Sequence, residues 1–218
     1  MLPRHPRIPA VVTGGQDTVA LRVPDHPLTL SLLRAFGRGL VAPSANRFGG
    51  ISPTAAAHVR EEFGERVAVI LDGGPCTVGI ESTILDLSGE PPAILRPGAI
   101  TAEALAAVLG QPPATGGTGR PRVPGSLARH YAPRTPLRLA PRPELEAAPP
   151  GTLLLAIGRL PPGRRGLALP AAPEAYARGL YAALRALDRE GAALILVERP
   201  PEDPAWSAIR DRLRRAAG

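Results

Sequence analysis

The stretch from Gly110 to Pro136 constrains the fold of this chain most, because it separates two parts with different secondary-structure patterns. It is rich in Gly, Pro, Thr and Arg and shows no hydrophobic period, which is typical of a linker. The sequence therefore predicts a first domain over residues 1–110, a linker over 111–136 and a second domain over 137–218. An apolar content of 44% is enough to bury a core.

The first domain mixes predicted strands and helices. Short β-branched or apolar runs that stop at Pro or Gly favour buried strands, whereas capping residues before longer runs favour helices. The predicted strands are residues 18–23, 39–42, 67–72, 82–88 and 93–96, and the predicted helices are residues 27–36, 54–63 and the segment from a Thr101 cap through Leu109.

The second domain has a simpler alternation. Residues 152–158 and 192–198 are predicted strands, and residues 173–190 and 204–217 are predicted helices. In the first of these helices Tyr176, Leu180, Leu184 and Leu187 share one face, as expected of a core-facing stripe. A β-α-β-α order indicates a small parallel sheet.

Composition excludes several kinds of chemistry. The chain has no Lys, so all 26 of its basic residues are Arg, which excludes a phosphate-loop lysine and a Schiff-base lysine. Arginine suits bidentate recognition of carboxylate and phosphate. The net charge of +7 can indicate affinity for nucleic acid, but we favour a compositional origin, because the basic residues form no dense run beyond Arg212, Arg214 and Arg215.

Other sequence features narrow the class of protein. Cys76 is the only cysteine, so an internal disulfide and a cysteine-based zinc cluster are both excluded. No segment reaches the roughly 18 consecutive apolar residues of a membrane span, and the start lacks the apolar run of a signal peptide. We therefore expect a cytoplasmic protein without membrane association.

Two turns carry side chains that can bind an anion. An apolar run ends in Pro43-Ser44-Ala45-Asn46, where backbone N–H groups and the side chains of Ser44 and Asn46 can converge on a negative group. The same residues also commonly make tight turns without a ligand. Arg96 is the last residue of the strand 93–96, directly before a turn, and could hold a phosphate, although an exposed arginine without a role is the more common case.

Polar side chains also interrupt two predicted strands. Thr18 and Arg22 share one strand face. On the other strand, Ser82 points opposite to Glu81 and Thr83, which suits either a small polar ligand or a strand cap. His130-Tyr131 places large side chains in the linker, which suggests docking. These residues indicate an α/β protein with an anionic ligand, but they do not specify a reaction.

Five motifs in series resemble one known family. DTVALRVP (17–24), APSANRFGGISPT (42–54), ILDGGPCTVGIESTILD (70–86) and ILRPG (94–98) resemble the back part of a YrdC-type domain. RHYAP (129–133) looks like the interdomain linker of the Sua5 branch, and residues 175–201 look like its C-terminal domain. The resemblance implies an α/β fold: a partial YrdC-like domain with a twisted mixed sheet, a linker, and a small Rossmann-like Sua5 C-terminal domain.

Members of this family make threonylcarbamoyl-adenylate from L-threonine, bicarbonate and ATP. The resemblance therefore implies a nucleotidyltransferase that uses Mg²⁺ with ATP, and whose product is passed to the tRNA threonylcarbamoyl transferase machinery for modification of position 37. By motif, the implied threonine contacts are Arg22, Ala42 and Ser82, the implied ATP contacts are Thr18, Ser44, Ser52, Arg96 and Tyr131, and Asn46 belongs to the anion-binding turn. No residue is implied as a catalytic acid, base or metal ligand.

One departure from the family pattern affects the expected activity. Family members begin with a long segment that carries a basic triphosphate grip, and this chain starts close to the DTVALRVP motif. We expect the chain to be an N-terminally incomplete synthase that is inactive as this fragment. The alternatives are a non-catalytic RNA- or partner-binding module and a carbamoyl-transfer relative of the hydrogenase-maturation type, which the RHYAP linker and the second domain disfavour.

Overall fold

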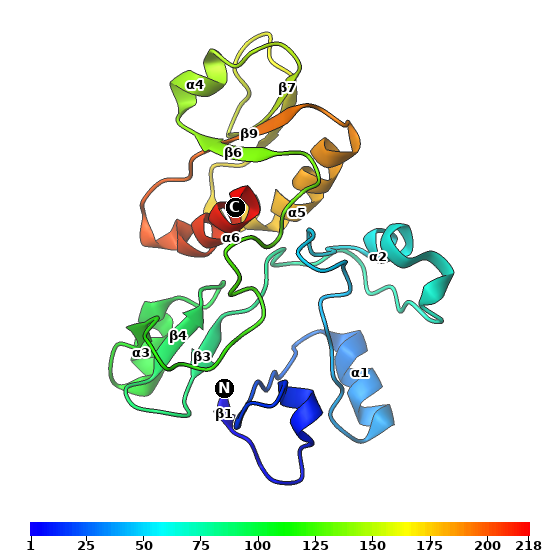
Figure 1. The fold of residues 1–218 in the computed structure, drawn as a ribbon, viewed down its shortest axis with the longest axis vertical. Helices are drawn as coiled ribbons and strands as arrows, with labels where there is room; N and C mark the ends of the chain where they lie inside the picture. Colours follow the sequence, from blue (N-terminus) through cyan, green and yellow to red (C-terminus); the bar gives the residue numbers. More distant parts are fainter.

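The computed structural model describes all 218 residues, from Met1 to Gly218. The second domain forms one compact end of the molecule in Figure 1, and the first part spreads out beneath it. No helix combines the length and apolar composition that a membrane crossing requires. The strands are β1 (Leu2–Pro3), β2 (Thr18–Val19), β3 (Ile84–Asp86), β4 (Ala93–Arg96), β5 (Ala114–Thr115), β6 (Leu137–Ala140), β7 (Thr152–Ile157), β8 (Gly166–Leu169) and β9 (Leu194–Glu198); the α-helices are α1 (Pro27–Phe36), α2 (Ala56–Phe63), α3 (Ala102–Leu109), α4 (Arg142–Glu146), α5 (Pro173–Arg189) and α6 (Ser207–Ala217), and 3₁₀ turns span Ala10–Thr13, Gly64–Arg66 and Pro204–Trp206.

The second domain is built on a four-stranded parallel sheet with the order β6-β9-β7-β8. Alternate side chains of a strand point to opposite faces. On β7, Leu153 and Leu155 join the core formed with α5 and α6, whereas Leu154 and Ala156 join a second core with Leu145 of α4. Both faces of the sheet are therefore covered, which explains the continuous apolar run of this strand.

Helix α5 supplies the largest apolar face. Tyr176, Leu180, Leu184 and Leu187 are fully buried, which confirms the predicted core-facing stripe. The parallel sheet was predicted as well, but β6 and β8 were not. Each of these strands has only four residues, and β8 begins at Gly166, where an added Cβ would lie 2.0 Å from the carbonyl oxygen of Leu154.

The first part contains a mixed three-stranded sheet. β4 pairs antiparallel with β3 and parallel with β5, and β1 and β2 form a separate antiparallel pair. Helix α3 begins as predicted, because the Oγ1 of Thr101 accepts a hydrogen bond from the backbone N–H of Ala104 at 3.3 Å. The helices predicted at 27–36 and 54–63 are present as α1 and α2.

Of the five strands predicted in the first part, only 93–96 forms over its full length, and 82–88 is a strand only at Ile84–Asp86. Of residues 18–23 only Thr18 and Val19 pair, and neither 39–42 nor 67–72 forms a strand. A strand needs a neighbour for its backbone N–H and C=O groups, and no strand lies alongside these segments. Their apolar side chains, which periodicity assigned to a core, are exposed instead, as for Val23, Val41 and Val69.

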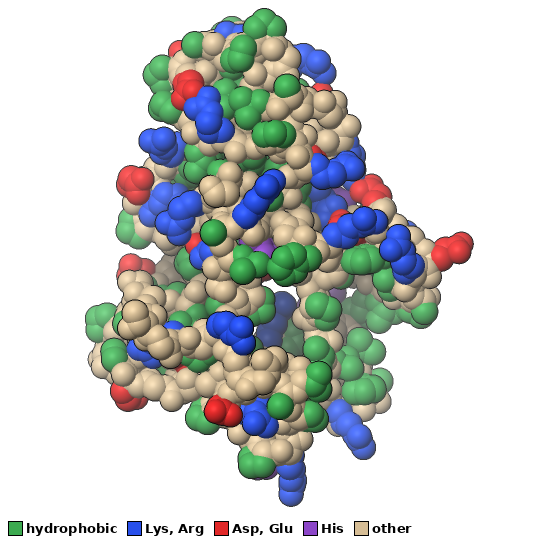
Figure 2. Space-filling view, in the orientation of Figure 1, with side chains coloured by type: hydrophobic (Ala, Val, Ile, Leu, Met, Phe, Trp, Pro, Cys, Tyr) green, Lys and Arg blue, Asp and Glu red, His purple; other side chains and the backbone are tan.

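The first part buries little apolar surface of its own. Among residues 1–110, the buried Val, Ile and Ala side chains are Val19, Ile51, Ala93 and Ile94. Figure 2 shows many apolar side chains on the surface of this part, and Phe48 is 90% exposed. Most of the hydrophobic stabilisation, which scales with buried apolar area, therefore comes from the second domain.

Helix α5 also holds the first part in place. Arg178 donates from Nε to the carbonyl oxygen of Thr77 at 2.8 Å, and Arg185 donates to the carbonyl oxygen of Ile51. Between these contacts, Gly79 lies so close to the helix that an added Cβ would be 2.4 Å from the Cα of Arg178. The segments around residues 51 and 79 thus depend on α5 for their position.

Truncation of a core leucine of α5 tests the importance of the core that the sheet forms with α5 and α6. We expect Leu184→Ala to lower the free energy of unfolding by about 2–5 kcal/mol, because it leaves a cavity at a fully buried position. Leu167→Ala on β8, where the side chain is 37% exposed, should cost less than about 1 kcal/mol. Urea denaturation followed by circular dichroism measures both, and equal losses would contradict this account of the core.

Asp188 links the last turn of α5 to the end of the linker. Its Oδ1 accepts a hydrogen bond from the backbone N–H of Thr135 at 2.8 Å. Burial alone would raise the pKa of this carboxyl, but hydrogen bonds from Thr135 and the charge of Arg134 outweigh it and lower the pKa. Since the folded-state pKa lies below the unfolded value of about 3.9, the ionised carboxylate stabilises the fold above that pH, and the contribution is lost as pH falls through the folded pKa.

Asp188→Asn should therefore remove a pH-dependent contribution to stability. We expect a loss of about 1 kcal/mol at pH 7, small for a charged hydrogen bond because Arg134 is solvent-exposed. The difference from the wild type should be constant above about pH 5 and shrink below about pH 4. Urea denaturation at a series of pH values measures it, with Glu190→Gln, an exposed carboxylate next to the same helix, as the control. A difference that grows on acidification would refute the assignment.

Candidate active site

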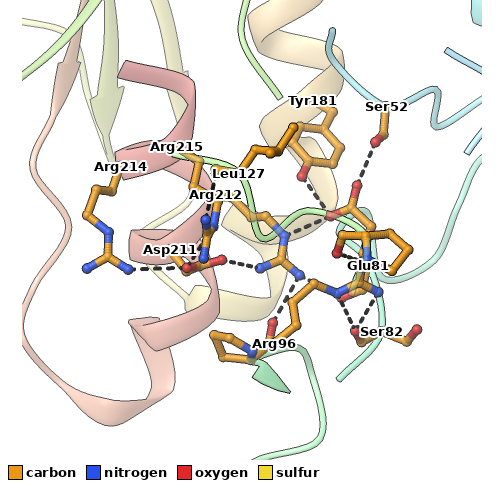
Figure 3. Close-up of polar contacts among 12 residues, drawn as sticks. Ser52, Glu81, Ser82, Arg96, Leu127, Tyr181, Asp211, Arg212, Arg214 and Arg215 are labelled. Carbon is orange, nitrogen blue, oxygen red and sulfur yellow. Dashed lines mark hydrogen bonds and ion pairs between the residues drawn. The ribbon is translucent and has the colours of Figure 1, made fainter. Parts of the chain in front are cut away.

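The carboxylate of Glu81 lies at the centre of a polar cluster between the two parts of the chain (Figure 3). Its Oε1 accepts a hydrogen bond from Ser52 Oγ at 2.6 Å, and its Oε2 accepts hydrogen bonds from Tyr181 OH at 2.8 Å and Arg212 Nε at 2.7 Å. Ser52 and Glu81 belong to the first part, whereas Tyr181 is on α5 and Arg212 on α6. One side chain thus joins both helices to two loops of the first part.

Arg212 is fully buried, yet every nitrogen of its guanidinium has an acceptor. Nη2 donates to the carbonyl oxygens of Pro97 at 2.9 Å and Glu81 at 3.2 Å, and Nη1 donates to Asp211 Oδ2 at 2.8 Å. A buried charge is tolerated when it is paired and hydrogen-bonded. The number of acceptors therefore explains why an arginine can occupy this position.

The neighbours of Glu81 keep its carboxylate ionised. Burial alone would raise its pKa, but the charge of Arg212 and the hydrogen bonds from Ser52, Arg212 and Tyr181 outweigh burial and lower the pKa. Burial and the Glu81 charge raise the pKa of the Tyr181 phenol well above its usual value. Tyr181 therefore remains a protonated donor to the carboxylate at neutral pH.

Arg96 ties the Ser82 backbone to the linker. Its Nε and Nη2 donate to the carbonyl oxygen of Ser82 at 3.1 and 2.9 Å, and its Nη1 donates to the carbonyl oxygen of Pro124 at 3.2 Å. The turn after Arg96 passes close to this strand, because a Cβ on Gly98 would lie 2.2 Å from the backbone nitrogen of Thr83. The Ser82 side chain itself is exposed, on the side opposite to Glu81.

Tyr131 of the linker is packed into the same cluster, as predicted for a docking residue. It is 1% exposed, its ring stacks on that of Tyr181 with centroids 5.7 Å apart, and the Arg212 guanidinium carbon lies 5.3 Å from its ring centre. Its hydroxyl is buried and has no hydrogen-bond partner. The neighbouring Ala132 donates from its backbone N–H to the carbonyl oxygen of Gly49 at 2.9 Å, which fixes the linker against the first part.

The structure brings together four of the predicted site residues. Ser52, Ser82, Arg96 and Tyr131 all lie in or directly beside the Glu81 cluster. The other five make no hydrogen bond to it. Of these, Arg22, Ala42 and Ser44 are exposed, and Thr18 and Asn46 each have a buried side-chain oxygen without a partner.

The loop of Asn46 closes on itself. Asn46 Nδ2 donates to the carbonyl oxygens of Arg47 at 2.7 Å and Gly50 at 3.1 Å, so its amide nitrogen orders the turn.

Arg22 forms no ion pair and no hydrogen bond with the chain, and its guanidinium is therefore free to pair with an external anion.

Sequence reasoning missed Tyr181 and Arg212. Arg212 was grouped with Arg214 and Arg215 as a basic run, but only Arg214, at 75% exposure, is a typical surface side chain. The helical period carries a signal that could have separated them. In a helix, residues three or four positions apart lie on the same face. Arg212 therefore shares a face of α6 with Ile209 and Ala216, which are both buried.

Comparison with known proteins gives this cluster a family context. Residues 1–98 match the Sua5/YciO/YrdC family model, described as telomere recombination, and residues 100–218 match the C-terminal domain of threonylcarbamoyl-AMP synthase. The threonylcarbamoyl-AMP synthase of Pyrococcus abyssi is 37% identical over all of this chain and 69% of its own length, and that of Bacillus subtilis is 38% identical over 95% of this chain and 65% of its own.

Solved structures agree with the sequence matches. The crystal structure of Pyrococcus abyssi Sua5 complexed with L-threonine aligns with the whole chain at a TM-score of 0.90 and 34% identity, and the alignment covers 69% of that protein. The chain thus spans about two thirds of the length of its relatives. From the family models, the sequence identity and the shared fold, this chain belongs to the Sua5 branch of the threonylcarbamoyl-AMP synthase family.

Proposed function

We propose that this chain catalyses the synthesis of threonylcarbamoyl-AMP from L-threonine, bicarbonate and ATP, with release of pyrophosphate. The main support is its similarity, along its full length, to a Sua5 structure that contains L-threonine. The clustering of Ser52, Ser82, Arg96 and Tyr131 adds to it, since the family motifs imply a ligand contact for each of them.

The free arginine and the exposed hydroxyl suit threonine. Arg22 is exposed and has no partner in the chain, and a guanidinium binds a carboxylate with two parallel hydrogen bonds. In the proposal Arg22, Ala42 and Ser82 contact threonine or its carbamate. The Ser82 hydroxyl is available to a ligand because the side chain is exposed and Arg96 contacts only the backbone carbonyl oxygen.

The remaining predicted residues would hold the nucleotide. Thr18 has a buried hydroxyl without a partner, as does Tyr131, and a ligand group could satisfy both. Ser44 and Ser52 would add hydroxyl contacts, and Arg96 a positive charge. Asn46 would order the anion-binding turn through the hydrogen bonds of its amide.

The reaction would proceed by positioning and charge stabilisation. The threonine amine first forms a bond to the carbon of bicarbonate, and a molecule of water leaves, which gives the carbamate. A carbamate oxygen then attacks the α-phosphorus of ATP, the new oxygen–phosphorus bond forms, and the bond to the pyrophosphate oxygen breaks. Chemistry of this kind needs alignment of the reactants and compensation of negative charge, and arginines and backbone N–H groups can provide both.

Mg²⁺ is part of the proposal only as a companion of ATP. No group of three His, Cys, Asp or Glu side chains lies in an arrangement that could hold a metal ion. Mg²⁺ commonly binds through substrate phosphates and water rather than through a protein cage, so the triphosphate would bring the ion with it. The product would pass to the tRNA threonylcarbamoyl transferase machinery, and we propose the cytoplasm as the location.

An assay of the purified chain tests this function. With ATP, Mg²⁺, L-threonine and bicarbonate, the proposed function requires threonine-dependent formation of threonylcarbamoyl-AMP, measured by mass spectrometry, and an equal amount of pyrophosphate, whereas a chain that is inactive as this fragment would yield neither. Pyrococcus abyssi Sua5 serves as the positive control. Threonine binding is measured separately by calorimetry, and a chain that neither makes the adenylate nor binds threonine would refute the proposal. Tight, salt-sensitive tRNA binding without threonine binding would instead favour an RNA-binding module.

A variant of Arg22 tests the threonine contact. Arg22→Gln should weaken threonine binding by about 10- to 100-fold, the equivalent of one charge-assisted hydrogen-bonded pair. Arg34→Gln on α1, which removes another exposed arginine without a partner, should leave the affinity unchanged. Equal affinities of the two variants would exclude Arg22 from the threonine site.

A further inference from the structure

We propose that Arg212, on the last helix of the second domain, is a positioning residue that holds the ligand-binding loops of the first part through Glu81. It connects the second domain to loops that lie more than 100 residues earlier in the chain. The part of this inference that concerns threonine affinity rests on the proposed function. The part that concerns the position of the loops does not.

The direction of the Arg212 contacts supports this role. Only one of its acceptors, Asp211, belongs to its own domain, and the other contacts are made to Glu81 and Pro97 of the first part. Residues that only stabilise a domain make their buried contacts within it. Arg212 instead uses the rigid second domain to fix two loops that have little apolar core of their own.

Each fixed loop carries a residue proposed to contact a ligand. Glu81 precedes Ser82 in the chain and accepts the hydrogen bond of Ser52. Pro97 follows Arg96, whose guanidinium in turn holds the carbonyl oxygen of Ser82. Arg212 is thus one contact away from three ligand residues without pointing to a ligand itself, which makes it a positioning rather than a catalytic residue.

Removing one charge of the Glu81–Arg212 pair should disturb the structure more than removing both. Glu81 has a side chain only 16% exposed, and without Arg212 its buried carboxylate would lose the charged group that is hydrogen-bonded to it. Such a group is more costly than the absence of the whole pair. It would take up a proton, which weakens the hydrogen bond from Ser52, or turn toward water, which breaks it. Neutralising both partners should therefore disturb the site less than neutralising Arg212 alone.

Helix α6 offers a matched control. Arg214 is two residues from Arg212 and pairs with the same Asp211 at 3.2 Å, but its side chain is 75% exposed. Arg214→Gln therefore removes the same charge from the same helix without touching the first part. Any effect seen in Arg212→Gln and absent in Arg214→Gln must come from the buried contacts.

Hydrogen exchange measured by mass spectrometry tests the positioning directly and needs no activity. In Arg212→Gln we expect peptides that contain residues 51–54, 80–83 and 97–99 to exchange at least about tenfold faster, as expected for local opening. Peptides from β7 and β9 should exchange at the wild-type rate. Unchanged exchange in the loop peptides would overturn the inference, because Arg212 would then not hold the loops. Equally faster exchange in β7 and β9 would also overturn it, because Arg212 would then only stabilise the whole fold.

Threonine affinity, measured by calorimetry, tests the consequence for the site. We expect Arg212→Gln to weaken binding by about tenfold or more, since breaking one side of a buried pair is strongly unfavourable. Arg212→Lys, which keeps the charge, should recover part of this loss. The Glu81→Gln/Arg212→Gln double variant should bind more tightly than Arg212→Gln, and Arg214→Gln should match the wild type.

The outcomes separate this inference from the proposed function. Wild-type threonine affinity in Arg212→Gln would overturn the positioning role. So would a double variant whose fold-loss of affinity equals the product of the losses in Glu81→Gln and Arg212→Gln. If the wild-type chain does not bind threonine at all, the proposed function fails, and the hydrogen-exchange result still decides whether Arg212 fixes the loops.

Discussion

The buried ion pair between Glu81 and Arg212 is the interaction on which the arrangement of the two parts depends. The pair is enclosed by Ser52, Tyr181 and the ring of Tyr131, which satisfy or cover its remaining surfaces. Burying two charges is unfavourable unless their hydrogen bonds are nearly complete. The pair therefore tolerates few alternative geometries, and it fixes the loops of the first part relative to α5 and α6.

The two parts differ in how they are stabilised. The second domain has a sheet covered on both faces and a continuous apolar core, whereas the first part exposes side chains such as Phe48 and Val69. Where the parts meet, Ile51 and Ile80 pack against the core of the second domain, and Arg178, Tyr181 and Arg185 of α5 add polar contacts. The order of the ligand-binding loops is thus linked to the stability of the second domain.

The linker completes this arrangement. Tyr131 contacts both the Arg212 guanidinium and the Tyr181 ring, and Arg96 reaches from β4 to the linker carbonyl of Pro124. These contacts share residues, so a substitution that breaks one of them also displaces the residues that make the others. This explains how a domain that holds none of the proposed ligand contacts can still influence the site.

The sequence alone determined the family, every α-helix except the short α4, the parallel sheet and the site motifs, because periodicity, capping and motif spacing are local properties that depend on neighbouring residues. It placed Thr101 at a cap and the Leu184 face in a core. Only the tertiary structure decided which apolar runs became strands, since pairing needs a partner distant in the chain, as residues 67–72 illustrate. It also decided that Arg212 is buried beside Glu81: two charges far apart in sequence reveal their pairing only when the fold removes both from water.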